Sequence, residues 1–274
     1  MFFSWLAERR RRRLLETPFP AAWSDVLGRS LLHHAYLDAD EQRHLRELVQ
    51  VFIAEKYWEG CGGLELDDEM RVTIAGQACL LLLGLDHGLY RNVETILVYP
   101  SAVMPKRAEE PMFAAPVVVN PVVPLIGEAH HRGPVILTWD AVRRGSRHAD
   151  GHNVVYHEFA HKIDMADGAV DGVPPVATRA EYDRWVEVCT REYEELRARF
   201  EAGLPTLLDP YAGTNVGEFF AVATEHFFDQ PCALADRHPE LYDVLRSFYR
   251  QDPAARERRS EPAMPANGSE PPSS

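Results

Sequence analysis

The chain has 274 residues, an apolar content of 46% and a net charge of −13, which suits one large domain with a sizeable core. The negative charge argues against nucleic acid as a ligand, because an acidic surface repels phosphate backbones. The four cysteines are widely spaced without a CxxC pair, so we expect reduced thiols and a cytoplasmic protein rather than a disulfide framework.

The first 17 residues form a strongly basic segment. Apolar residues come first and the arginine run 9–13 follows, which is the reverse of the order in a signal peptide. We expect a short helix over 1–16 that is either solvated or in contact with an acidic partner or a membrane surface. The longest apolar run, 78–85, is too short to span a bilayer, so no transmembrane segment is expected.

Hydrophobic spacing predicts the elements in chain order. An amphipathic helix over 38–58 begins with a capping box of Asp38 and Glu41, and a more apolar helix follows over 67–84. Branched apolar runs predict strands at 95–99, 116–119 and 135–138. The chain then becomes helical again, over 151–165, 178–202, 215–229 and 238–250. Beyond residue 252 the composition shifts to Pro, Ser, Glu and Arg, which predicts a disordered tail over 253–274. Residues 18–252 are expected to form the single domain.

The motif HExxH occupies residues 157–161. On a helix, residues four apart share one face, so His157 and His161 can bind one zinc ion. Glu158 lies beside the water that the metal activates and can act as the general base of a peptidase. Asp150 is the expected N-cap of this helix.

A catalytic zinc needs a third protein ligand and one open position. Glu218, in the first turn of a helix rich in Phe and Ala, is the preferred candidate, because a carboxylate among core residues must be paired or bind a metal. Its alternative role is a capping box with Asn215. Asp164 lies too far from His157 to share the ion and is expected, like Glu225, to orient a ligand histidine through its free ring nitrogen. The alternatives are a surface residue at the helix end for Asp164 and a snorkelling charge for Glu225.

Two segments, HEFAHKIDMADG at 157–168 and GEFFAVATEHFF at 217–228, closely resemble the Mlc titration factor A (MtfA) family of bacterial zinc peptidases. The resemblance extends to residues 70–83, 96–100 and 133–140, and so covers roughly 18–250. The catalytic part of that family is similar to anthrax lethal factor, a gluzincin with HExxH and a distant Glu.

The resemblance implies zinc ligation by His157, His161 and Glu218, with Glu158 as base. It also supports Tyr211, seven residues before the ligand Glu, as a donor to the developing oxyanion. It further implies aminopeptidase activity on short peptides and, in enterobacteria, binding to the glucose repressor Mlc.

These inferences predict a mostly helical α+β, zincin-like metallopeptidase fold. A small mixed β-sheet is expected to pack on the HExxH helix, and the Glu218 helix is expected to cross behind one Zn²⁺ per chain. Strand 134–139 is expected either to bind the peptide substrate by backbone pairing or to be an interior strand. The alternative function is a regulator that binds a transcription factor and retains zinc without catalysis.

Overall fold

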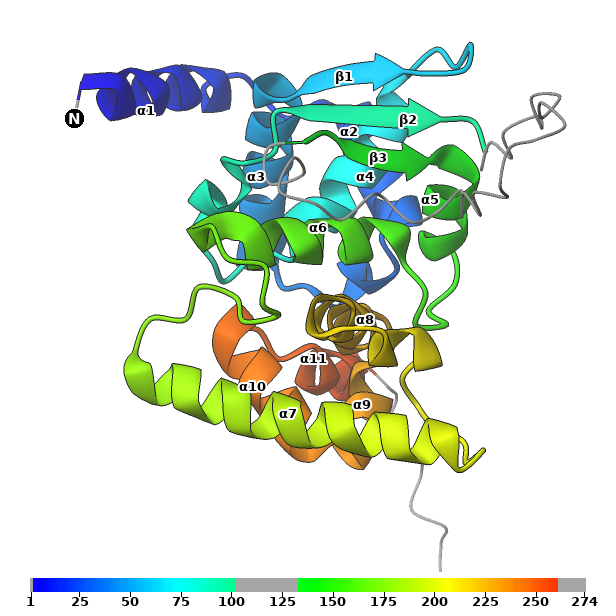
Figure 1. Ribbon diagram of the computed structural model, residues 1–274. Helices are drawn as coiled ribbons and strands as arrows, with labels where there is room; N and C mark the ends of the chain where they lie inside the picture. The colour runs from blue at the N-terminus through cyan, green and yellow to red at the C-terminus, as the bar shows by residue number, and fades with distance from the viewer. Residues whose placement is uncertain (1, 102–132, 261–274) are drawn as a thin grey trace, which may run out of the picture.

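The computed structural model describes residues 2–101 and 133–260 (Figure 1). The strands are β1 (Tyr57–Gly60), β2 (Thr95–Tyr99) and β3 (Val135–Thr138). The first helices are α1 (Phe2–Leu15), α2 (Ala21–Ser30), α3 (Ala39–Glu55), α4 (Asp68–Leu80), α5 (Trp139–Gly145) and α6 (Val154–Asp164). The later helices are α7 (Arg179–Glu201), α8 (Val216–Asp229), α9 (Pro231–Arg237), α10 (Pro239–Tyr249) and α11 (Pro253–Ser260). Short 3-10 turns include η1 (Leu32–Tyr36), η2 (His87–Tyr90), η4 (Met165–Asp167) and η5 (Pro210–Gly213). The expected mostly helical α+β fold is therefore confirmed.

The three described strands form one sheet in the order β1-β2-β3. Both pairings are parallel, with Trp58 opposite Ile96 and Ile96 opposite Val135. The expectation of a mixed sheet is therefore wrong for the described strands. Parallel neighbours need a crossover connection, and β1 and β2 are joined by one that contains α4. The predicted strand at 116–119 lies outside the described residues.

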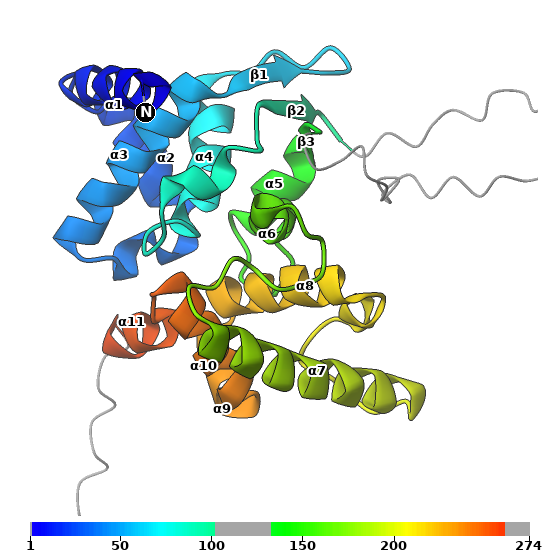
Figure 2. The ribbon, with the colours of Figure 1, turned by 60° about the vertical axis from the view of Figure 1, so that its left-hand side comes forward.

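The helices lie in two groups that meet at α6 and α8 (Figures 1 and 2). The sheet, α2, α3 and α4 lie on one side of α6, and α7, α9, α10 and α11 lie beyond α8 (Figure 2). Phe159 of α6 packs edge-on against Phe52 and Tyr90 in the first group. On the other side, Phe227 of α8 stacks on Tyr249 of α10 at 5.5 Å between ring centroids. Two aromatic clusters therefore hold α6 and α8 in fixed positions.

Local sequence explains where several helices begin. Asp38 accepts hydrogen bonds from the backbone of residues 40 and 41, and the Glu41 carboxylate accepts the Asp38 N–H at 3.0 Å. The predicted capping box of α3 is therefore confirmed. The helix ends at Glu55, before the predicted residue 58, because Tyr57 and Trp58 enter the sheet beside Thr95 and Ile96.

The predicted disordered tail is wrong in its first part, because Pro253–Ser260 forms α11. Asp252 accepts the Ala255 N–H at 3.0 Å and so caps this helix. Arg256 is buried and bonds to Glu41 of α3 and to Gln251. The low apolar content of these residues led to the prediction of disorder, whereas the helix is held in place by polar contacts rather than by an apolar stripe. Residues 261–274 lie outside the described residues.

Within the parts of the chain that the structure describes, no helix is both long and apolar enough to cross a membrane.

Candidate metal centre

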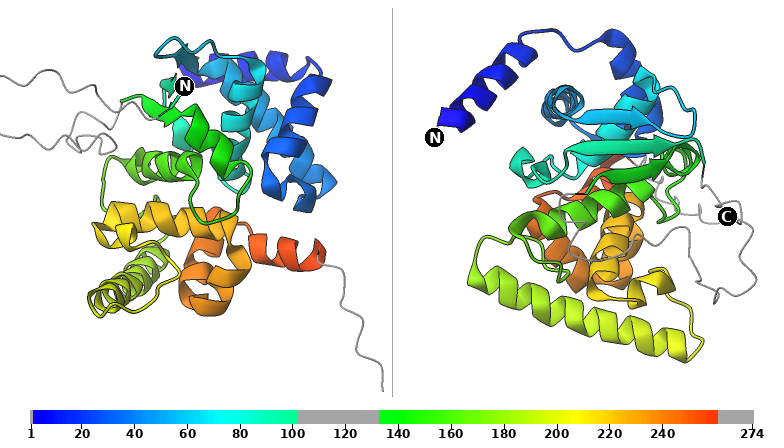
Figure 3. Two further views of the ribbon diagram at one scale, coloured as in Figure 1. Left: turned by 90° about the vertical axis from the view of Figure 1, so that its right-hand side faces the viewer. Right: turned by 45° about the horizontal axis from the view of Figure 1, so that its top comes forward.

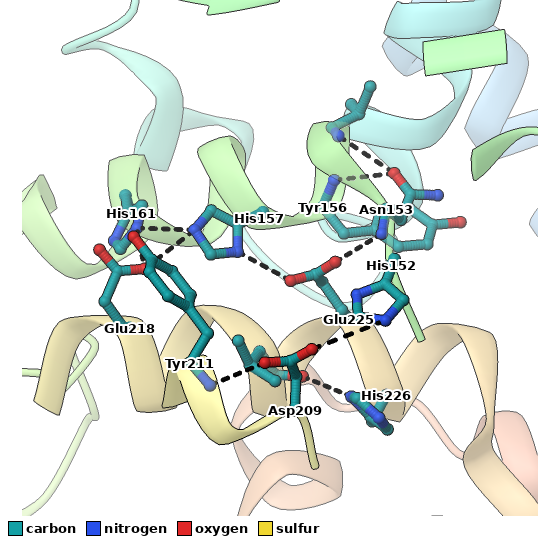
Figure 4. A network of polar contacts seen from close by, with 12 residues as sticks. His152, Asn153, Tyr156, His157, His161, Asp209, Tyr211, Glu218, Glu225 and His226 are labelled. Atoms are coloured by element: carbon teal, nitrogen blue, oxygen red, sulfur yellow. Dashed lines mark hydrogen bonds and ion pairs between the residues drawn. The ribbon is translucent and has the colours of Figure 1, made fainter. Parts of the chain in front are cut away.

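The helix α6 places both motif histidines on one face. Its N-cap is Asn153, whose side chain accepts from the backbone of Val155 at 3.1 Å and of Tyr156 at 3.2 Å. Asp150, the predicted N-cap, instead bonds to Arg144 at 2.9 Å. The two histidine rings stand nearly perpendicular to each other, at 82°, and meet through their Nε2 atoms, which lie 3.2 Å apart (Figure 4). Two nitrogen atoms at this spacing can bind one cation between them.

Glu218 enters the site from α8, on the facing side of α6 (Figure 4). Its Oε2 lies 3.0 Å from His157 Nε2 and 3.4 Å from His161 Nε2. Asn215 caps α8 by accepting the Glu218 N–H at 3.0 Å, but the reciprocal half of a capping box is not formed. The alternative role of Glu218 as a capping residue is therefore wrong, since its carboxylate faces the histidines.

The donor atoms of these three residues suit a metal ion. One ligand atom from each of His157, His161 and Glu218 lies within 4.8 Å of the other two. Glu218 Oε2 is buried and forms no hydrogen bond of good geometry with any described residue, although both rings are near. A buried oxygen with no hydrogen bond and two converging ring nitrogens form the His/His/Glu set that is typical of catalytic zinc.

Electrostatics in the site favour the positive charge of a metal. Burial opposes ionisation of Glu218, but the two nearby rings outweigh burial and lower its pKa to about 2. Burial opposes protonation of His157, yet the carboxylates of Glu218 and Glu225 raise its pKa to about 10. These carboxylates therefore stabilise positive charge at this point, and a divalent cation would take the place of a proton.

Glu225 of α8 is buried and lies behind His157, the first histidine of the motif. Its Oε1 is 2.7 Å from His157 Nδ1, and its Oε2 accepts the backbone N–H of Asn153. A ring whose Nδ1 donates to a carboxylate keeps the lone pair of Nε2 free for a metal. The same carboxylate also connects α8 to the first turn of α6.

Tyr211 and Glu158 lie at the solvent side of the site. Tyr211 is 44% exposed, and its ring centroid is 6.1 Å from that of His157. Partial burial, together with the negative charges of Glu218 and Glu158, raises the pKa of its phenol, which therefore stays a proton donor. Glu158 is half-buried and follows His157 on α6.

Asp164 does not lie where the sequence suggested. It is fully buried, and its Oδ2 accepts the Gly172 N–H at 3.2 Å, whereas Oδ1 has no hydrogen-bond partner within residues 2–101 and 133–260. No ring nitrogen of the ligand histidines donates to it. Burial raises its pKa to about 6. The surface alternative is likewise wrong, and Asp164 fastens the loop after η4 beneath α8.

Sequence reasoning missed two residues that shape the site. Asn153 caps α6 and is bound by Glu225. Asp209 accepts the Tyr211 N–H at 2.7 Å and so starts the turn η5 that presents the phenol (Figure 4). Both are typical helix-capping residue types, and Asp209 also precedes a proline, so a closer search for caps would have found them.

Known proteins match this chain over almost its whole length. The family model of the glucose-regulated metallo-peptidases M90 matches residues 5–250. An uncharacterised protein of Synechocystis is 40% identical over 251 residues, which cover 91% of this chain and 90% of that protein. Mlc titration factor A of Serratia proteamaculans is 33% identical, with coverage of 87% and 90%, and that of Escherichia fergusonii is 32% identical, with coverage of 87% and 89%. The chain belongs to the glucose-regulated metallo-peptidase M90 family.

Proposed function

We propose that the protein is a zinc-dependent, aminopeptidase-like peptidase of the cytoplasm, of the gluzincin type. The observation that carries this proposal is that His157, His161 and Glu218 converge on one point, where the buried Oε2 of Glu218 faces both ring nitrogens without a hydrogen bond to another described residue. These three residues would hold one zinc ion, which polarises a carbonyl and lowers the pKa of a water molecule. A His/His/Glu set leaves one position open for chemistry.

The chain's own residues would supply the remaining steps. Glu158 takes a proton from the attacking water at its carboxylate and passes it to the leaving amine. Tyr211 donates its phenolic proton in a hydrogen bond to the oxyanion, and its raised pKa keeps that proton available at neutral pH. Glu225 holds His157 in the tautomer that ligation requires.

The peptide would lie along β3. Among the described strands β3 is at one end of the order β1-β2-β3, and Ile136 in it is 49% exposed. A strand with an unpaired side can add an extended peptide by backbone hydrogen bonds. This strand runs directly into α5, next to the helix of the site.

The test combines metal content with turnover in three variants. We expect about one zinc per chain in the parent, loss of zinc in Glu218→Ala, and retained zinc without activity in Glu158→Gln. Peptides with a free and with an acetylated amino terminus separate exopeptidase from endopeptidase action. Turnover by Glu158→Gln at the parental rate, or full zinc content in Glu218→Ala, would reject the proposal.

A second candidate function is a regulator that binds a transcriptional repressor. The name Mlc titration factor A, carried by relatives at 32–33% identity, favours it. The Glu158→Gln variant also separates the two functions, because a purely regulatory role survives the loss of the base. Co-purification of a repressor with Glu158→Gln and parent alike, with no peptidase activity in either, would favour the regulator.

A further inference from the structure

The basic helix α1 projects from the body of the molecule (Figures 1 and 3). Its second half is fastened to α3. Arg11 donates two hydrogen bonds to the Glu55 carboxylate, at 2.6 and 2.8 Å, and the Gln50 side chain donates to the carbonyls of Leu14 and Thr17 at 3.0 Å. One arginine of the run therefore serves the fold, and α1 is held at a defined angle on α3.

The other arginines of the run face solvent. Arg9, Arg10, Arg12 and Arg13 are exposed, whereas Arg11 is half-buried. In the described chain, no carboxylate forms an ion pair with Arg10, Arg12 or Arg13. Because the whole chain carries −13, the body is strongly acidic, yet no described carboxylate pairs with these three arginines. A concentrated positive patch of this kind is complementary to a negatively charged surface.

A hollow between α1 and α3 adds a place for an anionic group. It measures about 280 Å³, and its lining includes Arg10, Arg11 and Arg13, with Glu55 as the one carboxylate. Glu55 is already engaged by Arg11. The remaining guanidinium groups at this hollow are therefore available to a phosphate oxygen.

The sequence before the arginines discriminates between negatively charged partners. Phe2, Phe3, Trp5 and Leu6 precede them in the same helix. Apolar aromatic residues beside arginines are typical of helices that lie in the interface of a lipid bilayer, where the apolar groups enter the headgroup boundary and the arginines contact phosphates. A nucleic acid offers no comparable apolar layer to four such residues.

We propose that α1 binds the surface of membranes rich in anionic lipids, with Arg9, Arg10, Arg12 and Arg13 on the headgroup phosphates and the preceding apolar residues in the interface. The site belongs to other elements, α6 and α8, and α8 lies on the side of α6 that is opposite to α1 (Figure 2). Membrane binding would therefore hold the protein at a surface without covering the metal centre, and it does not depend on the proposed peptidase function.

The test is flotation of the full chain with vesicles of phosphatidylcholine alone and of phosphatidylcholine with phosphatidylglycerol. We expect binding to the second vesicles only. Each arginine near an anionic surface contributes about a fivefold factor, so replacing Arg9, Arg10, Arg12 and Arg13 by Gln should weaken binding by about 100-fold or more. Replacing them by Lys keeps the charge and should retain most of the binding. A Ser variant of Phe2, Phe3, Trp5 and Leu6 should also lose binding.

The variants leave the Arg11–Glu55 contact intact, and circular dichroism checks that they are folded. The matched control replaces the exposed Arg237, Arg250, Arg258 and Arg259 by Gln, which changes the net charge equally and should leave binding unchanged. Equal binding of the parent to both vesicles, absence of binding to either, or parental binding by the α1 Gln variant would overturn the proposal. Retention on duplex DNA without binding to vesicles would overturn it in favour of a nucleic-acid partner.

Discussion

The Glu225→Gln substitution tests how the metal centre is held in place. Glu225 is 5% exposed, and its carboxylate lies 2.7 Å from His157 Nδ1 and accepts the Asn153 N–H. Glutamine keeps the shape of the Glu225 side chain but removes its negative charge. Its NH₂ group would face either His157 Nδ1–H or the Asn153 N–H, and because both partners are hydrogen-bond donors, one of the two hydrogen bonds is lost.

The expected magnitudes follow from these two contacts. Loss of a carboxylate behind a ligand histidine lowers metal affinity by about 10- to 100-fold. Loss of a charge-assisted hydrogen bond costs about 1.5–3 kcal/mol, so the free energy of unfolding without metal should fall by about 2–3 kcal/mol.

Zinc affinity is measured by competition with a chromophoric chelator, and stability is measured by urea unfolding of the metal-free protein. The matched control is Glu195→Gln, because Glu195 is exposed on α7, and it should change neither quantity. If Glu225→Gln binds zinc within twofold of the parent, the position of His157 does not depend on this carboxylate and the reasoning is wrong.

Three further predictions concern the rest of the fold. Burial, followed by the nearby charge of Arg256, lowers the pKa of His33 from 6.5 to about 4. Between these pH values the unfolded chain binds more protons than the folded protein, so the free energy of unfolding should fall by about 3 kcal/mol as the pH drops from 6.5 to 4. Urea titrations of His33→Phe should show that fall largely removed, and a parental pH profile would contradict the assignment. A Cβ at Gly84 would lie 2.3 Å from the Tyr249 carbonyl oxygen, so Gly84→Ala should cost about 1–3 kcal/mol in a melting experiment, while Gly28→Ala, which meets nothing within 4 Å, should not destabilise. Phe227 is fully buried against Tyr249, so Phe227→Ala should cost about 3–5 kcal/mol in urea, and a loss below 1 kcal/mol would show that the cluster re-forms around the gap.

The residues of the metal centre could be selected from sequence because their signals are local. HExxH determines the relative position of His157 and His161 by helix geometry alone. Glu218 was found because a carboxylate among Phe and Ala residues needs a partner. The strands at 95–99 and 135–138 and the capping box of α3 are equally local patterns, and the structure has them at these residues.

What the sequence did not determine depends on contacts between distant segments. The parallel direction of the sheet, the role of Tyr57–Gly60 as a strand and the helix α11 all depend on neighbours far along the chain. From the sequence, both Asp164 and Glu225 were candidates for the carboxylate that orients a ligand histidine. Only the packing of α8 on α6 brings Glu225 to His157 Nδ1 and leaves Asp164 on the Gly172 amide. Short-range patterns specify a residue's chemistry and its helix face, but the distance between two faces is set by the side chains packed between them, and no single segment of the sequence contains that information.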